Sequence, residues 1–170
     1  MLPLRRSRGR GAGLPEPRKG ATGQLMKVLV VESDSDQADT IRKMLHNWGH
    51  KAHTCGSGKD ALKTFMKIHC DLVLTEALLP DMKGEELISR LKTFSPDMHV
   101  VAMTWNNSRE LEARIRAQGV LYYMVKPFET ESLRSLLEHL SRRGLKATKT
   151  VESREGSAAV VARRRANRRL

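Results

Sequence analysis

The chain has 170 residues and a formal net charge of +12, from 31 Lys and Arg against 19 Asp and Glu. This length suits one compact domain with tails. The two cysteines, Cys55 and Cys70, are too few for a disulfide framework and lack metal-ligand spacing. No run approaches the ~18 apolar residues of a membrane span, and the basic N-terminus lacks the apolar stretch of a secretory signal. We therefore predict a cytoplasmic protein.

The excess positive charge is concentrated at the two ends of the chain. Residues 1–25 carry a net charge of +5 and residues 141–170 a net charge of +8, whereas residues 26–140 carry −1. Residues 1–25 are rich in Gly and Pro and poor in large apolar side chains, which predicts a disordered N-terminal extension. Residues 141–170 are predicted to form a basic, mostly disordered tail, because a lone short helix is marginal in water. Residues 26–140 are predicted to form the folded domain.

Within residues 26–140, short apolar runs alternate with segments of helical periodicity. The predicted strands are 28–31, 51–55, 71–75, 99–104 and 121–125, and the apolar stripes of the predicted helices span 38–48, 61–68, 87–94, 109–118 and 133–140. Ser108 is a candidate N-cap, and Gly49 and Gly119 stand where helix C-caps are expected. Strands alternating with helices of this length predict an α/β fold, with a parallel sheet covered by helices on both faces.

Charged groups and hydroxyls follow the carboxyl ends of several predicted strands. In open α/β sheets the working site lies outside these ends. Each such residue alone has an ordinary structural explanation as a helix-terminal, loop or surface group. Taken together they predict one charged pocket. They are Glu32, Ser33 and Asp34 after the first strand, Glu76 after the third, Thr104 after the fourth, and Lys126 with Pro127 after the fifth.

The order of these motifs resembles the receiver domain of two-component response regulators over the whole of residues 26–140. The matching segments are Val-Leu-Val-Val before the acidic cluster, Asp-Leu-Val-Leu before Glu76, Leu-Leu-Pro-Asp-Met-Lys-Gly ending at Gly84, Met103-Thr104, and Tyr-Met-Val-Lys-Pro-Phe starting at Tyr123. The resemblance implies a flavodoxin-like (βα)5 receiver fold with a five-stranded parallel sheet.

In that family an Asp at the end of the third strand accepts a phosphoryl group, and an acidic pair after the first strand helps to hold Mg²⁺. Carried over by position, the resemblance makes Glu76 the phosphoacceptor equivalent and places Glu32 and Ser33 at the acidic pair. Thr104, Tyr123 and Lys126 match the residues that contact the phosphoryl group or respond to it. The Lys126–Pro127 peptide bond is a candidate cis bond.

The sequence departs from the family pattern at three positions. At Glu76 one extra methylene moves the carboxylate outward by about 1.3–1.5 Å, beyond the roughly 0.5 Å tolerance of a reacting constellation. Transfer to Glu76 is therefore predicted to be poor or absent. Ser33 replaces a carboxylate, so Mg²⁺ binding is predicted to be weak or absent, with Asp34 and Glu76 as its remaining ligands. Trp105 follows Thr104 where a small residue is usual; its indole either covers the pocket or is simply an exposed loop aromatic.

The leading hypothesis is an atypical receiver without an output domain that acts in two-component signal transduction through protein–protein contacts. It is predicted to need neither phosphorylation nor a cofactor and not to be an enzyme, with Glu76 as a permanent charge paired with Lys126 and accepting from Thr104. A kinase, an output protein or a second copy would bind the face around Tyr122, formed by helix four, strand five and helix five. The alternatives are a functional phosphoacceptor and a nucleic-acid-binding protein that uses its basic tails.

Overall fold

The computed structural model describes residues 24–142, so the predictions made for residues 1–23 and 143–170 lie outside the described part. Five strands alternate with five helices along the chain. In chain order the elements are β1 (Lys27–Val31), α1 (Ser35–Asn47), β2 (Lys51–Cys55), α2 (Gly58–Lys67), β3 (Leu72–Glu76), α3 (Gly84–Phe94), β4 (His99–Thr104), α4 (Arg109–Ala117), β5 (Tyr122–Val125) and α5 (Thr130–Arg142).

The strands form one parallel sheet in the order β2-β1-β3-β4-β5. The central strands are continuous apolar runs because helices cover both of their faces: β3 is buried along its whole length, and β4 from its second residue onward. The edge strand β2 is mostly exposed, which matches its polar sequence. The predicted α/β class and the (βα)5 architecture are confirmed.

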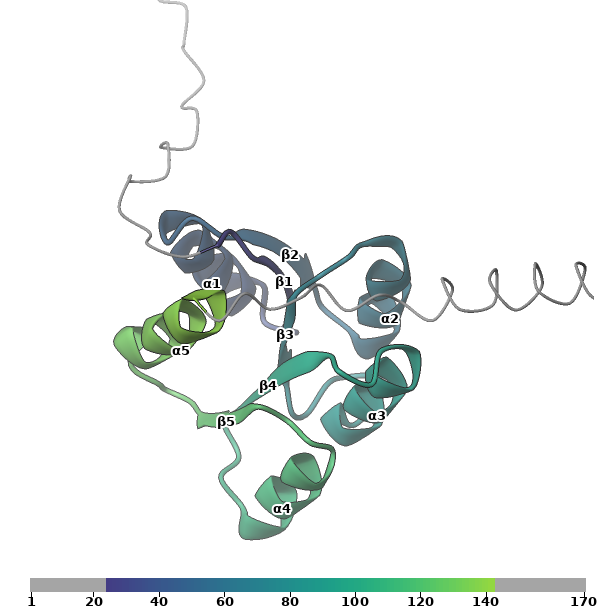
Figure 1. Cartoon of the computed structure of the whole chain (residues 1–170). Coiled ribbons are helices and arrows are strands. Elements are labelled where there is room, and N and C mark those ends of the chain that lie inside the picture. The colour runs from purple at the N-terminus through teal and green to yellow at the C-terminus, as the bar shows by residue number, and fades with distance from the viewer. Residues whose placement is uncertain (1–23, 143–170) are drawn as a thin grey trace, which may run out of the picture.

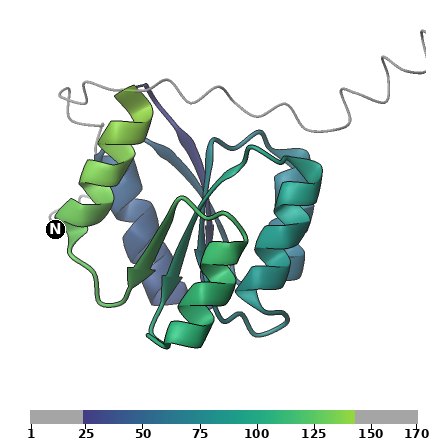
Figure 2. The ribbon, with the colours of Figure 1, turned by 60° about the horizontal axis from the view of Figure 1, so that its bottom comes forward.

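The sheet lies between two layers of helices (Figures 1 and 2), with α1 and α5 on one face and α2, α3 and α4 on the other. Each face carries its own apolar core. Ile41, Leu45, Leu133 and Leu137 from α1 and α5 pack on one side, and the other core is built on the side chains of α2, α3 and α4. Two buried layers of this kind hold the strand ends in fixed register.

Side-chain caps and glycines set several helix boundaries. Ser108 caps α4 by accepting from the Leu111 N–H at 3.1 Å, as the sequence predicts. Gly49 and Gly119 follow the ends of α1 and α4 with φ values of 84° and 71°. That left-handed conformation is strained for residues with a side chain, so glycine is the residue that ends these helices at low cost.

The structure differs from the predicted boundaries at four places, the first being β1, which starts at Lys27, one residue earlier than predicted. Strand β3 starts at Leu72 and includes Glu76, because Glu76 continues the ladder opposite Met103. Strand β5 starts at Tyr122, one residue later than predicted. Helix α5 runs to Arg142, two residues past the predicted domain end. Within residues 24–142, no helix has the length and apolar character needed to cross a membrane.

Candidate functional site

Three charged side chains from three strand ends meet at the carboxyl edge of the sheet. Glu32 follows β1, Glu76 ends β3, and Lys126 follows β5. The Lys126 Nζ donates to Glu76 Oε2 at 2.6 Å and forms a second ion pair with Glu32 Oε2. The sequence prediction that Glu76 pairs with Lys126 agrees with this geometry. We call these three residues the charged cluster.

The charged cluster is withdrawn from water. Glu32, Glu76 and Lys126 are 3%, 6% and 6% exposed. Isolated buried charges are very costly, so such groups persist only when paired and hydrogen-bonded. The remaining carboxylate oxygens are paired as well: Glu32 Oε1 accepts from the Asp34 N–H at 3.1 Å, and Glu76 Oε1 accepts from the Ala77 N–H at 3.0 Å. Two carboxylates and one ammonium leave the cluster with a formal charge of −1.

The loop after Glu76 is held against the start of α3 by close backbone contact. The Gly84 N–H donates to the Ala77 carbonyl at 2.9 Å. A Cβ at Gly84 would lie 2.8 Å from both the Cα and the carbonyl oxygen of Ala77, closer than backbone atoms permit. Only glycine fits this approach, so Gly84 helps to fix the backbone whose Ala77 N–H donates to the Met103 carbonyl at 2.8 Å and also to the Glu76 carboxylate at 3.0 Å.

Thr104 lies beside the charged cluster but bonds elsewhere. It is fully buried, and its Oγ1 accepts from the Asn106 N–H at 3.1 Å. Among the described residues, no hydrogen bond from the Thr104 hydroxyl to Glu76 is found, and Glu76 directs one oxygen to Lys126 and the other to the Ala77 N–H. The threonine hydroxyl oxygen thus closes a local turn after β4.

Tyr123 joins the same turn from β5. Its hydroxyl donates to the Asn106 carbonyl at 3.3 Å, and its ring is buried beneath the Arg116 guanidinium, 5.7 Å from the ring centroid. Burial raises the pKa of the Tyr123 hydroxyl, and the nearby Glu112 carboxylate adds to that effect. Thr104 and Tyr123 thus contact one loop residue, Asn106, from two strands.

Trp105 lies at the outer side of the charged cluster. Its ring centroid is 5.7 Å from the Lys126 Nζ, within the range of a cation–π contact, while 58% of its surface stays exposed. Both expectations for this residue hold in part, because the indole is an exposed loop aromatic and also borders the site. The peptide bond between Lys126 and Pro127, a candidate cis bond from the sequence, is cis.

Ser33 and Asp34 do not join the charged cluster. Ser33 is exposed, and Asp34 caps α1, accepting at Oδ1 from the Asp36 and Gln37 N–H groups at 2.9 and 3.0 Å. These hydrogen bonds, the one from the Gln37 N–H foremost, lower the pKa of the Asp34 carboxyl. The acidic segment after β1 is therefore split between an ion-pair role for Glu32 and a helix-capping role for Asp34.

The donor set does not fit Mg²⁺, the ion that the resemblance implies. Mg²⁺ needs oxygen ligands in near-ideal octahedral geometry. Both oxygens of Glu32 and of Glu76 already accept hydrogen bonds, and the Lys126 ammonium stands between the two carboxylates. Within residues 24–142, no group of three or more His, Cys, Asp or Glu is arranged to hold a metal ion.

Two residues near the site have roles that the sequence reasoning missed. Asp81 accepts from the Gly58 and Lys59 N–H groups at 2.8 and 2.9 Å and so ties the β3–α3 loop to the start of α2. These bonds lower the pKa of the Asp81 carboxyl, the one from Lys59 most strongly. Asn106 links Thr104 to Tyr123 through its backbone. The sequence shows that Asn106 lies in a polar turn. Its two hydrogen-bond partners come from separate strands, so they could not be predicted from the local sequence.

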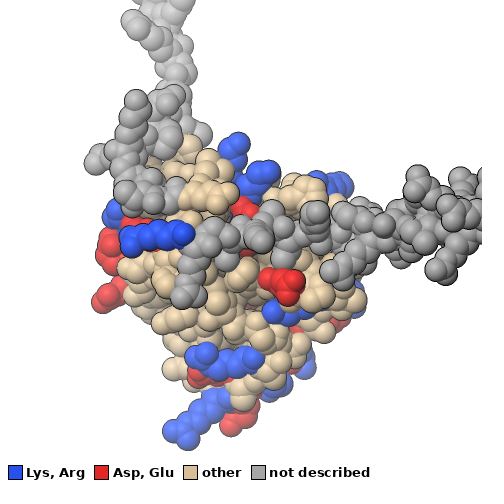
Figure 3. Space-filling view, viewed as in Figure 1, with Lys and Arg blue, Asp and Glu red and all other residues tan. Residues whose placement is uncertain are grey.

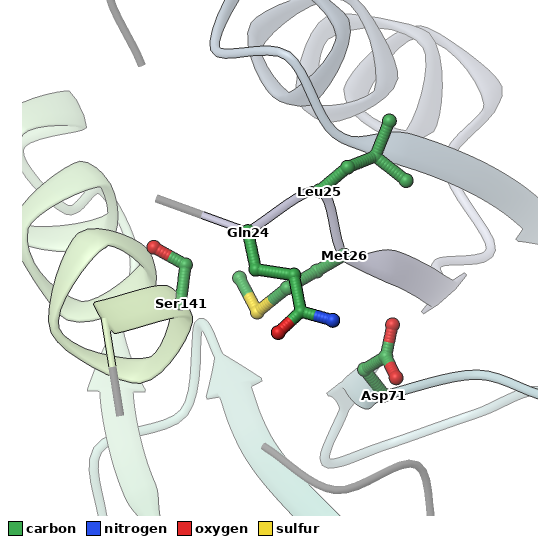
Figure 4. A pocket seen from close by; sticks show the side chains of 5 residues that line it. All are labelled: Gln24, Leu25, Met26, Asp71 and Ser141. Atoms are coloured by element: carbon green, nitrogen blue, oxygen red, sulfur yellow. The ribbon is translucent and has the colours of Figure 1, made fainter. Parts of the chain in front are cut away.

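A hollow lies at the opposite, amino-terminal edge of the sheet (Figure 4). It is lined by Gln24, Leu25, Met26, Asp71 and Ser141. Asp71 Oδ2 accepts from the Lys27 N–H at 2.7 Å, which makes its role structural. The hollow contains none of the residues predicted for the site.

Comparison with known proteins identifies the family. Residues 28–138 match the profile of the response regulator receiver domain. The chain belongs to the response regulator receiver family. This receiver is 28% identical over 133 residues to the transcriptional regulatory protein ZraR of Klebsiella oxytoca, a match that covers 78% of this chain and 30% of ZraR. It is 27% identical over 111 residues to the DNA-binding transcriptional regulator NtrC of Azospirillum brasilense, covering 65% of this chain and 23% of NtrC.

Solved structures show the same fold. The CheY-like receiver domain protein of Methanospirillum hungatei superposes with a TM-score of 0.65 at 24% identity, covering 69% of this chain and 94% of that one. By contrast, the receiver spans less than a third of ZraR or NtrC. The similarity to those regulators therefore concerns their receiver segments.

Proposed function

We propose that this receiver works in two-component signalling without being phosphorylated, by contacting a protein partner. The observation that carries the proposal is the Lys126 ammonium held between Glu32 and Glu76. Glu76 stands at the phosphoacceptor position and supplies a permanent charge of −1, against about −1.5 to −2 for a phosphoryl group. The pairing holds the site in one arrangement instead of leaving it to switch.

The chemistry of phosphoryl transfer is disfavoured at three points. The Glu76 carboxylate is buried, and its oxygens are already engaged by the Lys126 ammonium and the Ala77 N–H, which lowers its nucleophilicity and its access to a phosphodonor. The Lys126 ammonium stands between the Glu32 and Glu76 carboxylates where a cation would bind, and Ser33 contributes no carboxylate. The Trp105 indole lies against the Lys126 ammonium, with 5.7 Å between the ring centroid and the Nζ, and adds bulk beside the site.

Intact-mass measurement after incubation with acetyl phosphate and Mg²⁺ tests the proposal. The native chain is expected to gain no phosphoryl mass, and a phosphoryl adduct on Glu76 would overturn the proposal. Glu76→Asp combined with Ser33→Asp restores both missing features and is expected to accept a phosphoryl group. Glu76→Asp alone separates the effect of side-chain length from that of the second carboxylate. A typical receiver treated in parallel verifies the phosphodonor.

The partner is proposed to bind the face formed by α4, β5 and α5. Tyr122 and Leu121 are 53% and 40% exposed at the outer edge of the sheet. Exposed aromatic residues flanked by polar ones are common anchors of protein interfaces. Proteins that co-purify with the native chain but not with Tyr122→Ala would identify the partner. Met66→Ala, on α2 and also exposed, is the matched control.

Nucleic-acid binding through the basic C-terminal segment is the second candidate. Residues 141–170 carry a net charge of +8, and the proteins similar to the receiver include regulators described as transcriptional or DNA-binding. On the face shown in Figure 3, by contrast, Lys and Arg residues of the domain are interspersed with Asp and Glu. A steep fall of DNA affinity with salt, lost on deletion of residues 143–170, would support this candidate.

A further inference from the structure

The first two residues of the β4–α4 loop contact different parts of the domain: one contacts the charged cluster, and the other contacts strand β5, which belongs to the proposed partner face. At the start of the loop, Trp105 lies against Lys126, with 5.7 Å between the ring centroid and the Nζ. One residue later, the Asn106 N–H donates to the Thr104 hydroxyl oxygen, and the Asn106 carbonyl accepts from the Tyr123 hydroxyl. A short path therefore runs from Lys126 to Trp105 by the cation–π contact, along the chain to Asn106, and from the Asn106 carbonyl to Tyr123 by a hydrogen bond.

The Thr104 hydroxyl is not part of that path. Within the described residues, the hydrogen bond found at its oxygen is the one from the Asn106 N–H. The direct side-chain contact between the loop and the ammonium is made by the indole instead. The Lys126 N–H also donates to the Thr104 carbonyl at 2.7 Å, but this backbone bond does not depend on the charge of the cluster.

The ammonium is positioned by the two carboxylates and in turn positions the indole. Lys126 Nζ has ion pairs with both Glu32 and Glu76, so loss of either negative charge lets the ammonium move toward the other. A cation–π contact weakens when the cation leaves the face of the ring, beyond about 6 Å from its centroid. More than half of the Trp105 surface is exposed, so the indole is not enclosed by a surrounding core.

We propose that Trp105 is a positioning residue that couples the charged cluster to the β4–α4 loop and to Tyr123, in place of the Thr104 hydroxyl. This inference rests on the proposed function in one respect, that Glu76 acts as a permanent charge. The charge of Glu76 holds the ammonium, the ammonium holds the indole, and the indole holds the turn whose Asn106 carbonyl receives Tyr123. The conformation of the partner face is thus set by the sequence and not by a phosphoryl group.

A double-mutant cycle followed by NMR amide exchange tests the coupling, with no phosphodonor present. The four proteins are the native chain, Glu76→Gln, Trp105→Leu and the combined variant. Glu76→Gln is expected to lower protection of the Asn106 amide by about fivefold or more, the lower end of ordinary coupling between sites. When Trp105→Leu is already present, Glu76→Gln is expected to change protection of the Asn106 amide by less than about twofold, as for independent sites. Trp105→Phe retains an aromatic face and is expected to restore the response.

Equal responses to Glu76→Gln with and without Trp105 would overturn the proposal. If Trp105→Leu alone removes all protection at Asn106, the Tyr123 ring resonances provide the readout: a shift on adding Glu76→Gln contradicts the coupling, and no shift supports it. Glu110→Gln removes an exposed carboxylate from α4 and should leave both readouts unchanged. Because no phosphodonor is used, a phosphoryl adduct on Glu76 would refute the proposed function without altering the result of this cycle.

Discussion

At the scale of single residues, the balance of charge in the cluster sets the cost of each substitution. Lys126→Met leaves the Glu32 and Glu76 carboxylates buried together without a cation, so we expect a loss of about 3–5 kcal/mol in the free energy of unfolding. Glu76→Gln leaves the Lys126–Glu32 ion pair, which has no net charge, and a glutamine side chain that still accepts a hydrogen bond. Its expected cost is smaller, about 1–2 kcal/mol.

Urea unfolding at neutral pH measures both of these values. Lys63→Met is the matched control, because Lys63 is 72% exposed at its side chain and such a change should stay within about 0.5 kcal/mol. A cost for Lys126→Met no larger than that for Glu76→Gln would show that Lys126 is not needed to neutralise the two buried carboxylates.

His50 gives the domain a pH dependence below neutrality. The side chain is buried, its Nδ1 accepts from the Met26 N–H at 3.3 Å, and burial lowers its pKa from 6.5. The unfolded chain therefore binds the proton first as pH falls, so stability is complete above about pH 6.5 and declines below it. His50→Gln keeps an acceptor and should flatten this decline, measured by urea unfolding between pH 7 and 5. An unchanged slope would contradict the assignment.

Two other groups of titrating residues are separable from His50. The pKa of His99 is also lowered, chiefly by burial, so His99→Gln should reduce the same slope in part. The lowered pKa values of Asp34 and Asp81 act in the same direction but at more acidic pH. Their contribution is present above the ordinary pKa of 3.8 and is lost as pH falls through the lower folded values.

At the scale of elements, Asp81 joins the β3–α3 loop to helix α2. Asp81→Ala removes the acceptor of the Gly58 and Lys59 N–H groups, while Ser57 still caps the helix by accepting from the Asp60 N–H at 3.2 Å. We therefore expect faster amide exchange at Gly58 and Lys59 with the rest of α2 unchanged. Asp97→Ala, at an exposed position, should change neither amide. Equal protection in Asp81→Ala and the native chain would refute the link.

The elements themselves were largely predictable from the sequence. Strands and helices follow from apolar periodicity, and the caps at Ser108, Gly49 and Gly119 from residue type, because these signals are local. The positions of Glu32, Glu76 and Lys126 followed from the rule that strand ends gather at one edge. The hydrogen bond that the Thr104 hydroxyl oxygen accepts from the Asn106 N–H did not follow, because it depends on the conformation of the loop after β4.

At the scale of the whole molecule, the charge of +12 and the folded domain are separate features. The charge excess lies in residues 1–25 and 141–170, whereas both apolar cores are built from residues between Met26 and Leu140. Hydrophobic burial is the main favourable term in folding. We therefore propose that residues 26–140, extended to Arg142 by the end of α5, contain the complete folding unit.

A chain cut to residues 24–142 tests this boundary. We expect its free energy of unfolding in urea to equal that of the full chain within about 0.5 kcal/mol. Its m-value should also be unchanged, because the m-value follows the surface exposed on unfolding. A chain starting at Val28 is the control and should be less stable, since it lacks Met26, which is 2% exposed and donates its N–H to His50. A lower m-value in the 24–142 chain would show instead that the basic ends pack on the domain and belong to its fold.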